Sequence, residues 1–176
     1  MNYYYFAASL PTLALDGKPP FSRKGFAAQC RANLSPAHAR AFAALTDDSI
    51  AAPHPFVKVW RELDAQIRNQ VAALRAARRK VEAGPFLRPD VPFSADTAKA
   101  VSDAFALPNP LQRERAIDRF RWDQIERIQG FDMFSINAIL GYAVKLQLVD
   151  RWASLSDERG RTRASDLIEQ RSRADH

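Results

Sequence analysis

The stretch from Phe131 to Leu155, FDMFSINAILGYAVKLQLVDRWASL, constrains the fold more than any other part of the sequence. It contains no proline, and its apolar residues recur at steps of three and four, which places them on one face of an α-helix. Two adjacent apolar rows result, formed by Ile136, Leu140, Val144, Leu148, Trp152 and Leu155 and by Ile139, Ala143, Leu146 and Val149. A face of this width is typical of a helix surrounded by other helices, so the pattern predicts a helix bundle.

A second long amphipathic helix is predicted from Phe56 onward. Its apolar stripe consists of Phe56, Trp60, Leu63, Ile67, Val71 and Leu74. This nearly heptad spacing favours packing along a partner helix at a shallow angle. We expect the helix to end near Gly84 and Pro85, since glycine followed by proline is a common helix stop.

Shorter helices are expected between prolines and capping residues. Ser22, Ser35 and Ser94 each precede a helical pattern and are predicted N-caps. The shorter helices are expected at 23–33, 37–45, 95–107, 111–129 and 164–170. Residues 2–10 fit a short strand or a helix, and their four aromatic rings predict a place in the core. Clean apolar and polar alternation is absent, so the predicted fold class is all-α: a multi-helix bundle with two long amphipathic helices.

The proline-rich residues 85–93 are the best candidate for a domain boundary. Three prolines in this segment predict a stiff, extended connector. We expect an N-terminal helical lobe at 1–84 and a C-terminal helical lobe at 94–176, either as two small lobes or packed as one domain.

Composition narrows the environment in which the protein works. The net charge of +6 is compatible with binding to an acidic partner, a nucleic acid or an anionic membrane surface. The same charge can also arise without any such partner, because a GC-rich genome favours codons for Arg and Ala. The single cysteine, Cys30, lies on an apolar helical row, which predicts a buried thiol in a reducing compartment. No segment has the ~20 apolar residues needed to cross a bilayer. The N-terminus lacks the basic start of a signal peptide, so we expect a cytoplasmic protein.

Motifs for catalysis or cofactor binding are not visible. His38 and His54 are the histidines outside the tail, and neither belongs to an H-E-x-x-H or similar ligand pattern. The Glu-x-x-His pairs of di-iron bundles and the glycine-rich phosphate-binding loops are also missing. We therefore expect no catalytic residue, no metal, no cofactor and no small-molecule substrate.

Two basic segments are the candidate contact surfaces. They comprise Arg75, Arg78, Arg79 and Lys80 at the end of the second long helix, and Arg159, Arg161 and Arg163 near the C-terminus. Such residues can contact phosphates or an acidic partner surface. Cations at the end of a helix can equally serve the fold, by complementing the helix dipole with up to ~1 kcal/mol. The helix is too long for the recognition helix of a helix-turn-helix protein. Contact with an acidic protein surface is therefore the preferred interpretation, and DNA binding is the alternative.

Two stretches resemble known families. NYYYFAASLP, followed by FSRKGFAAQCRANLS, resembles a family of uncharacterised bacterial proteins encoded among V/A-type ATPase subunits. INAILGYAVKLQLVDRWASLSDERGRTRASDLIE is similar to the closing helices of the C subunit of these rotary ATPases, whose eukaryotic counterpart is the d subunit. The positions that match are Tyr142, Lys145, Leu148, Arg151 and Leu155.

The resemblance implies an all-helical, funnel-like accessory or central-stalk adaptor, without catalysis or cofactor, in a proton- or sodium-translocating ATPase. Its partners would be the rotor ring and the central stalk, and it would be peripheral on the inner membrane only through that complex. The C subunit repeats its helical unit in a longer chain, so this chain can hold only part of that fold. The alternative function is that of a basic helical nucleic-acid-binding protein using the surface from Arg75 to Lys80, with affinity that falls steeply with salt.

Overall fold

The computed structural model describes residues 3–51 and 54–155, and every regular element within these ranges is helical. In chain order the elements are α1 (Tyr4–Ala8), α2 (Arg23–Asn33), α3 (Pro36–Ala44), α4 (Pro55–Arg79), the 3₁₀ turn η1 (Gly84–Phe86), α5 (Ala95–Ala106), α6 (Pro110–Gln129) and α7 (Ile136–Ser154). The predicted all-α class is therefore confirmed. A third helix joins the two long ones, because α6 has 20 residues, beside 25 in α4 and 19 in α7.

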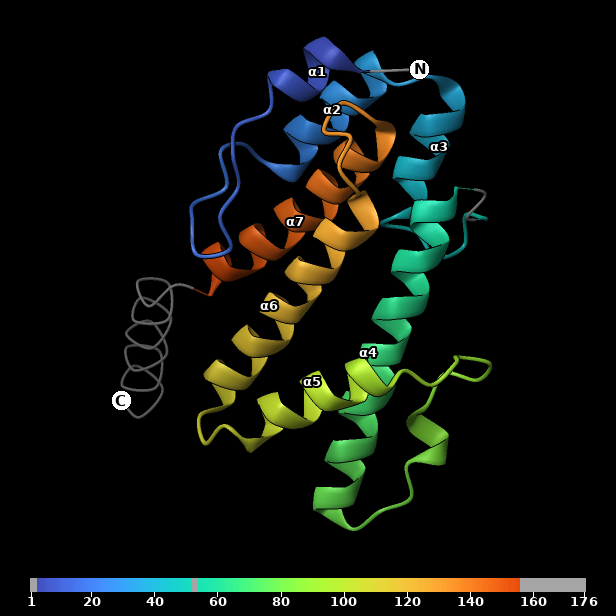
Figure 1. Ribbon diagram of the computed structural model, residues 1–176, viewed down its shortest axis with the longest axis vertical. Coiled ribbons are helices and arrows are strands. Elements are labelled where there is room, and N and C mark those ends of the chain that lie inside the picture. Colours follow the sequence, from blue (N-terminus) through green and yellow to red (C-terminus); the bar gives the residue numbers. More distant parts are fainter. Residues whose placement is uncertain (1–2, 52–53, 156–176) are drawn as a thin grey trace, which may run out of the picture.

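The helices form an elongated bundle (Figure 1). α1, α2 and α3 gather at the upper end in that view, around the first half of α7. α4 runs down to the lower end, and α5 crosses between α4 and α6. α6 and α7 are antiparallel neighbours, so the start of α6 lies beside the end of α7. Among the described residues no helix is both long and apolar enough to span a membrane.

The predicted N-caps start helices as expected. Ser22, Ser35 and Ser94 each accept a hydrogen bond from the backbone N–H three residues later, at 3.1, 3.4 and 3.3 Å. Each bond satisfies one of the backbone donors that the first helical turn leaves free. Proline occupies the first turn of α3, α4 and α6, where the missing N–H costs nothing.

Two helix ends differ from the prediction. α7 begins at Ile136 rather than at Phe131, because the Ser135 side chain caps it by accepting from the Ala138 N–H at 3.4 Å. α4 ends at Arg79, before the glycine and proline. Lys80 closes it in the left-handed conformation, with φ of 55°. A lysine thus takes the place that glycine usually fills at a helix end.

The aromatic N-terminus is buried only in part. α1 is a helix, and Tyr3 and Phe6 point into the core while Tyr4 and Tyr5 are exposed. The expectation of four buried rings was wrong for these two tyrosines, since so short a helix has only one face to pack.

Within the described part of the chain, three buried clusters hold the bundle together. The aromatic core joins α1, α2 and the first half of α7 through Tyr3, Phe6, Phe26, Cys30, Leu34, Ile139, Ala143 and Leu146. A central cluster joins α3 and α4 to α6 and α7, and includes Trp122 and Trp152. A lower cluster packs α4 against α5 and α6. Residues on both sides of the connector at 85–93 therefore pack together in shared clusters.

Candidate functional site

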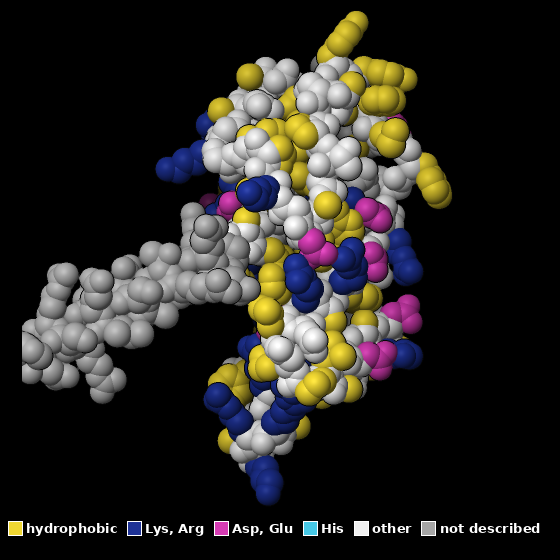
Figure 2. All heavy atoms as spheres, turned by 90° about the vertical axis from the view of Figure 1, so that its left-hand side faces the viewer, with side chains coloured by type: hydrophobic (Ala, Val, Ile, Leu, Met, Phe, Trp, Pro, Cys, Tyr) yellow, Lys and Arg dark blue, Asp and Glu magenta, His cyan; other side chains and the backbone are white. Residues whose placement is uncertain are grey.

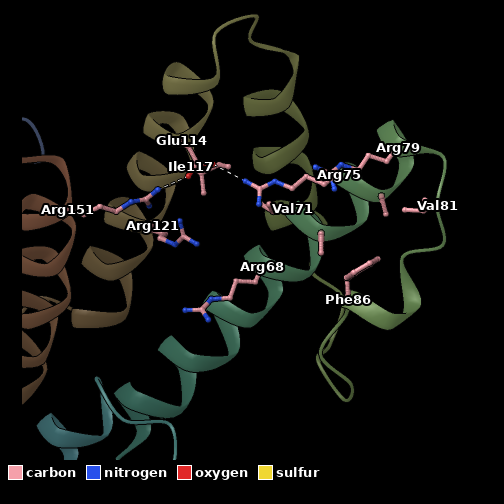
Figure 3. Close-up of a pocket in the computed structure, with 12 residues that line it drawn as sticks. Arg68, Val71, Arg75, Arg79, Val81, Phe86, Glu114, Ile117, Arg121 and Arg151 are labelled. Carbon is pink, nitrogen blue, oxygen red and sulfur yellow. Dashed lines mark hydrogen bonds and ion pairs between the residues drawn. The ribbon is translucent and has the colours of Figure 1, made fainter. Parts of the chain in front are cut away.

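A groove lined by arginines opens between α4, the start of α6 and the end of α7 (Figure 3). Its volume is about 510 Å³. We call it the arginine groove, after its cationic lining residues Arg68, Arg75, Arg79, Arg121 and Arg151. Figure 2 shows Lys and Arg side chains gathered toward the end of the molecule where α4 ends.

Helix geometry explains why these arginines meet. Arg68, Arg75 and Arg79 are seven and four residues apart, which places them on one face of α4. Because α6 and α7 are antiparallel, Arg151 near the end of α7 lies beside Glu114 near the start of α6. The spacing along one helix and the pairing of two others together build the groove.

Glu114 bridges the two sides of the groove. Its carboxylate accepts from the Arg75 guanidinium on α4 at 3.2 Å and from the Arg151 guanidinium on α7 at 2.8 Å (Figure 3). Burial alone would lower the pKa of Arg151, but the hydrogen bond to Glu114 and the charges of Asp118 and Glu114 outweigh it and raise that pKa above its usual value. Arg151 therefore stays charged at every physiological pH.

A buried carboxylate lies beneath this bridge. Asp118 is fully buried and accepts from Arg121 at 2.8 Å, from Arg151 at 2.9 Å and from the Trp152 indole N–H at 3.0 Å. An isolated charge would be costly there, and these three donors compensate it. Asp64 on α4 completes the network by binding both Arg68 and Arg121, at 2.6 and 3.2 Å.

The groove keeps an excess of positive charge. Its five arginines face three carboxylates, those of Asp64, Glu114 and Asp118. Among the described residues Arg79 has no ion-pair partner. A groove with surplus guanidinium groups is suited to binding an anionic ligand or an acidic surface.

The structure separates the predicted basic residues at the end of α4. Arg75 and Arg79 line the groove, as Figure 3 shows. Arg78 faces α5 instead: it donates to the Phe105 carbonyl oxygen at 2.6 Å, and its guanidinium lies 4.9 Å from the Phe105 ring centroid. Lys80 closes α4 and is not among the groove lining. The other predicted contacts, Arg159, Arg161 and Arg163, lie outside the described residues.

Three of the groove arginines lie outside the predicted contacts. Arg68 could have been found from its spacing to Arg75 and Arg79 on one face of α4. Arg151 is a position of family resemblance but belongs to neither predicted basic segment. Arg121 gives no sequence signal, because arginines occur all round α6 and nothing local tells which of them faces α4.

Other reactive side chains are engaged in the fold. Burial raises the pKa of Cys30 to about 12, so its thiol is not the thiolate that nucleophilic chemistry requires. The Tyr3 hydroxyl lies 2.6 Å from His38 Nδ1, and the His38 and His54 rings are 5.9 Å apart. Within residues 3–51 and 54–155, no three or more His, Cys, Asp or Glu side chains gather as metal ligands would.

A second exposed surface lies where α1 meets the loop between α6 and α7. The Tyr3 N–H donates to the Phe134 carbonyl oxygen at 2.9 Å, and the Tyr4 ring stacks on Phe134 with centroids 4.0 Å apart. Hydrophobic side chains protrude from this end of the molecule (Figure 2). We call it the apolar end, after its exposed residues Tyr4, Tyr5, Phe131 and Met133.

Comparison with known proteins gives one partial match. A family described as "Protein of unknown function (DUF2764)" matches residues 99–173, which include α6 and α7 and less than half of the chain. The matched range contains residues 136–169, the stretch that resembles the closing helices of the C subunit. No curated protein and no solved structure matches the chain.

Proposed function

We propose that this protein is a non-catalytic accessory or central-stalk adaptor subunit of a V/A-type ATPase, which links the rotor ring to the stalk. The observation that supports the proposal most strongly is the arginine groove, a cleft between three helices whose arginines outnumber its carboxylates. Its natural occupant is an acidic surface of another subunit, because complementary charges steer association and fix the register of two proteins.

The distribution of surfaces supports a linking role. The arginine groove lies between α4, the start of α6 and the end of α7. The apolar end lies near the opposite terminus of α7, where the loop that precedes this helix meets α1. Exposed aromatic residues are frequent anchors in protein interfaces. A charged contact at one surface and an apolar contact at another would let one small helical protein hold two neighbours.

The residues that carry the family resemblance also support the proposal. Tyr142 packs against Phe26 in the aromatic core, and Lys145 binds Glu126 at 2.8 Å, which joins α7 to α6. Arg151 lies in the arginine groove. The stretch similar to the C subunit thus includes the helix that connects the two surfaces.

A nucleic-acid-binding role is the second candidate. Arg79, which forms no ion pair among the described residues, and the largely exposed Phe86 both line the groove. Arginine beside an aromatic ring is a common way to hold single-stranded nucleic acid. This role predicts affinity that falls steeply as salt rises.

A pull-down from the native cells tests the proposal. Tagged protein is recovered in mild detergent, and the proteins that follow it are identified by mass spectrometry. We expect rotor-ring and central-stalk subunits in fixed proportion, and their loss from the Arg75→Glu/Arg79→Glu double variant. The matched control is Arg31→Glu/Arg40→Glu, which makes the same charge change at exposed positions of α2 and α3. Recovery of nucleic acid or unrelated proteins without ATPase subunits would contradict the adaptor role.

A further inference from the structure

We propose that the arginine groove binds an acidic segment of a partner protein, which inserts an apolar side chain between the charged edges of the groove. This inference deepens the adaptor role, because it names the chemistry of the partner, and it rests on that role only for the partner's origin.

The floor of the groove is apolar. Val71 on α4 and Ile117 on α6 form its base, and Phe86 in η1 stands at its edge with 65% of its surface exposed (Figure 3). Ala72 and Ala76 keep the cavity open, since larger side chains at these positions of α4 would fill it. A volume of about 510 Å³ falls within the ~300–1,000 Å³ range of protein ligand pockets. The floor can therefore accept a leucine or phenylalanine side chain.

The edges of the groove offer donors to carboxylates. The side chains of Arg75 and Arg151 are 62% and 41% exposed although Arg75 binds Glu114 and Arg151 binds both Glu114 and Asp118. A guanidinium carries five N–H donors, so these ion pairs leave donors on each arginine unused. Arg79 adds a cation without an ion-pair partner in the described part of the chain. Carboxylates on either side of an apolar residue would each find an arginine.

The same features disfavour a polyphosphate chain as the occupant. Glu114 places a negative charge in the middle of the groove, between Arg75 and Arg151, where closely spaced phosphates would be repelled. A phosphate backbone also gains little from the apolar floor formed by Val71 and Ile117. A peptide carries carboxylates and apolar side chains in one segment, which matches both the edges and the floor.

Binding of labelled peptides to the full-length protein tests the inference. The probe is a short fluorescein-labelled peptide of Glu and Asp alternating with Leu and Phe, followed by fluorescence anisotropy. Two matched peptides replace either the acids with Gln and Asn or the apolar residues with Ser. We expect saturable binding of the first peptide, weakened about tenfold or more in each of the other two. Equal binding of the Ser peptide would overturn the inference, since charge alone would then explain the affinity.

Two single variants locate the bound peptide. Arg79→Glu and Phe86→Ser should each weaken binding of the first peptide by about tenfold. Both residues are exposed and Arg79 makes no ion pair in the described structure. Phe86→Ser should therefore leave the melting temperature unchanged, and Arg79→Glu should lower it only slightly, because it reverses a cation in the last turn of α4. The controls are Arg40→Glu on α3 and Phe131→Ser in the loop after α6, which should bind as the parent does. Equal losses in the controls would place the peptide elsewhere and overturn the inference.

A single-stranded oligonucleotide serves as competitor and distinguishes the other class of partner. Displacement of the peptide at lower concentration than the unlabelled peptide itself, with affinity falling steeply with salt, would overturn the inference in favour of nucleic acid. The peptide-binding assays can fail while the pull-down succeeds, so the two experiments test different statements. ATPase subunits recovered by a protein that ignores the peptides would leave the adaptor role standing and remove only this inference.

Discussion

The aromatic core and the arginine groove are built in opposite ways. In the aromatic core, Phe26 is almost fully buried and lies within 5.2–6.2 Å, centroid to centroid, of four other rings, those of Phe6, Phe21, Phe42 and Tyr142. In the groove, guanidinium and carboxylate groups hold three helices together around a cavity. Close packing leaves a ligand no room, whereas paired charges around a cavity keep both room and unused donors. Both regions therefore hold helices together, but only the groove does so around a cavity that could accept a ligand.

Phe26→Ala is the strongest test of the aromatic core. Removing a buried phenylalanine loses its transfer free energy and leaves a cavity, so we expect a loss of about 4 kcal/mol in the free energy of unfolding. Urea denaturation measures it, at low salt and again at high salt. The loss should be the same in both, because no charge is involved, while Phe131→Ala at the apolar end should change stability little. A loss that shrinks in high salt would mean that charges also stabilise the aromatic core, so that the two regions would not differ in the way described.

Asp118→Asn tests the charged region in the same assay. The substitution keeps the shape of the side chain but removes the charge that compensates Arg121 and Arg151, so we expect a loss of about 3 kcal/mol. Asp123→Asn is the control, since Asp123 is an exposed aspartate on the same helix. If Asp118→Asn matches that control, the network does not hold α6 to α7, and the groove owes its shape to packing alone.

The sequence predicts one of these regions better than the other. Apolar spacing is a local property, so the buried rows of α7 and the stripe of α4 could be predicted, and Ser22, Ser35 and Ser94 marked helix starts. The groove depends on which helices become neighbours, and local spacing does not contain this. Arg78 and Arg79 are adjacent in the sequence, yet one turns to α5 and the other to the groove, because successive residues point about 100° apart on a helix.

The same limit applies to burial at the N-terminus. Four consecutive aromatic residues predict a place in the core, but a single turn of helix presents only part of them to it. Tyr3 and Phe6 are three residues apart and share the inner face, which leaves Tyr4 and Tyr5 outside. The pattern identified the segment that packs, and the helical period decided which of its rings do so.

Glu126→Gln gives the smallest effect and probes the contact between α6 and α7 that lies between the two regions. The Glu126 carboxylate accepts from Lys145 at 2.8 Å and from the Trp122 indole N–H at 3.0 Å. Its pKa is lowered, chiefly by the hydrogen bond from Lys145. Because the Glu126 side chain is half exposed, we expect the substitution to cost about 0.5 kcal/mol or less at pH 7.

The sign of its pH dependence separates this contact from plain packing. A carboxyl group whose pKa is lower in the folded than in the unfolded protein stabilises the fold above its unfolded pKa of about 4.3. That contribution is lost as pH falls through the lower folded value. The difference in unfolding free energy between the parent and Glu126→Gln should therefore be present at neutral pH and vanish in acid, when urea denaturation is repeated along a pH series. A difference that persists at low pH would mean that the side chain acts through shape, so that packing, as in the aromatic core, also governs the contact between α6 and α7.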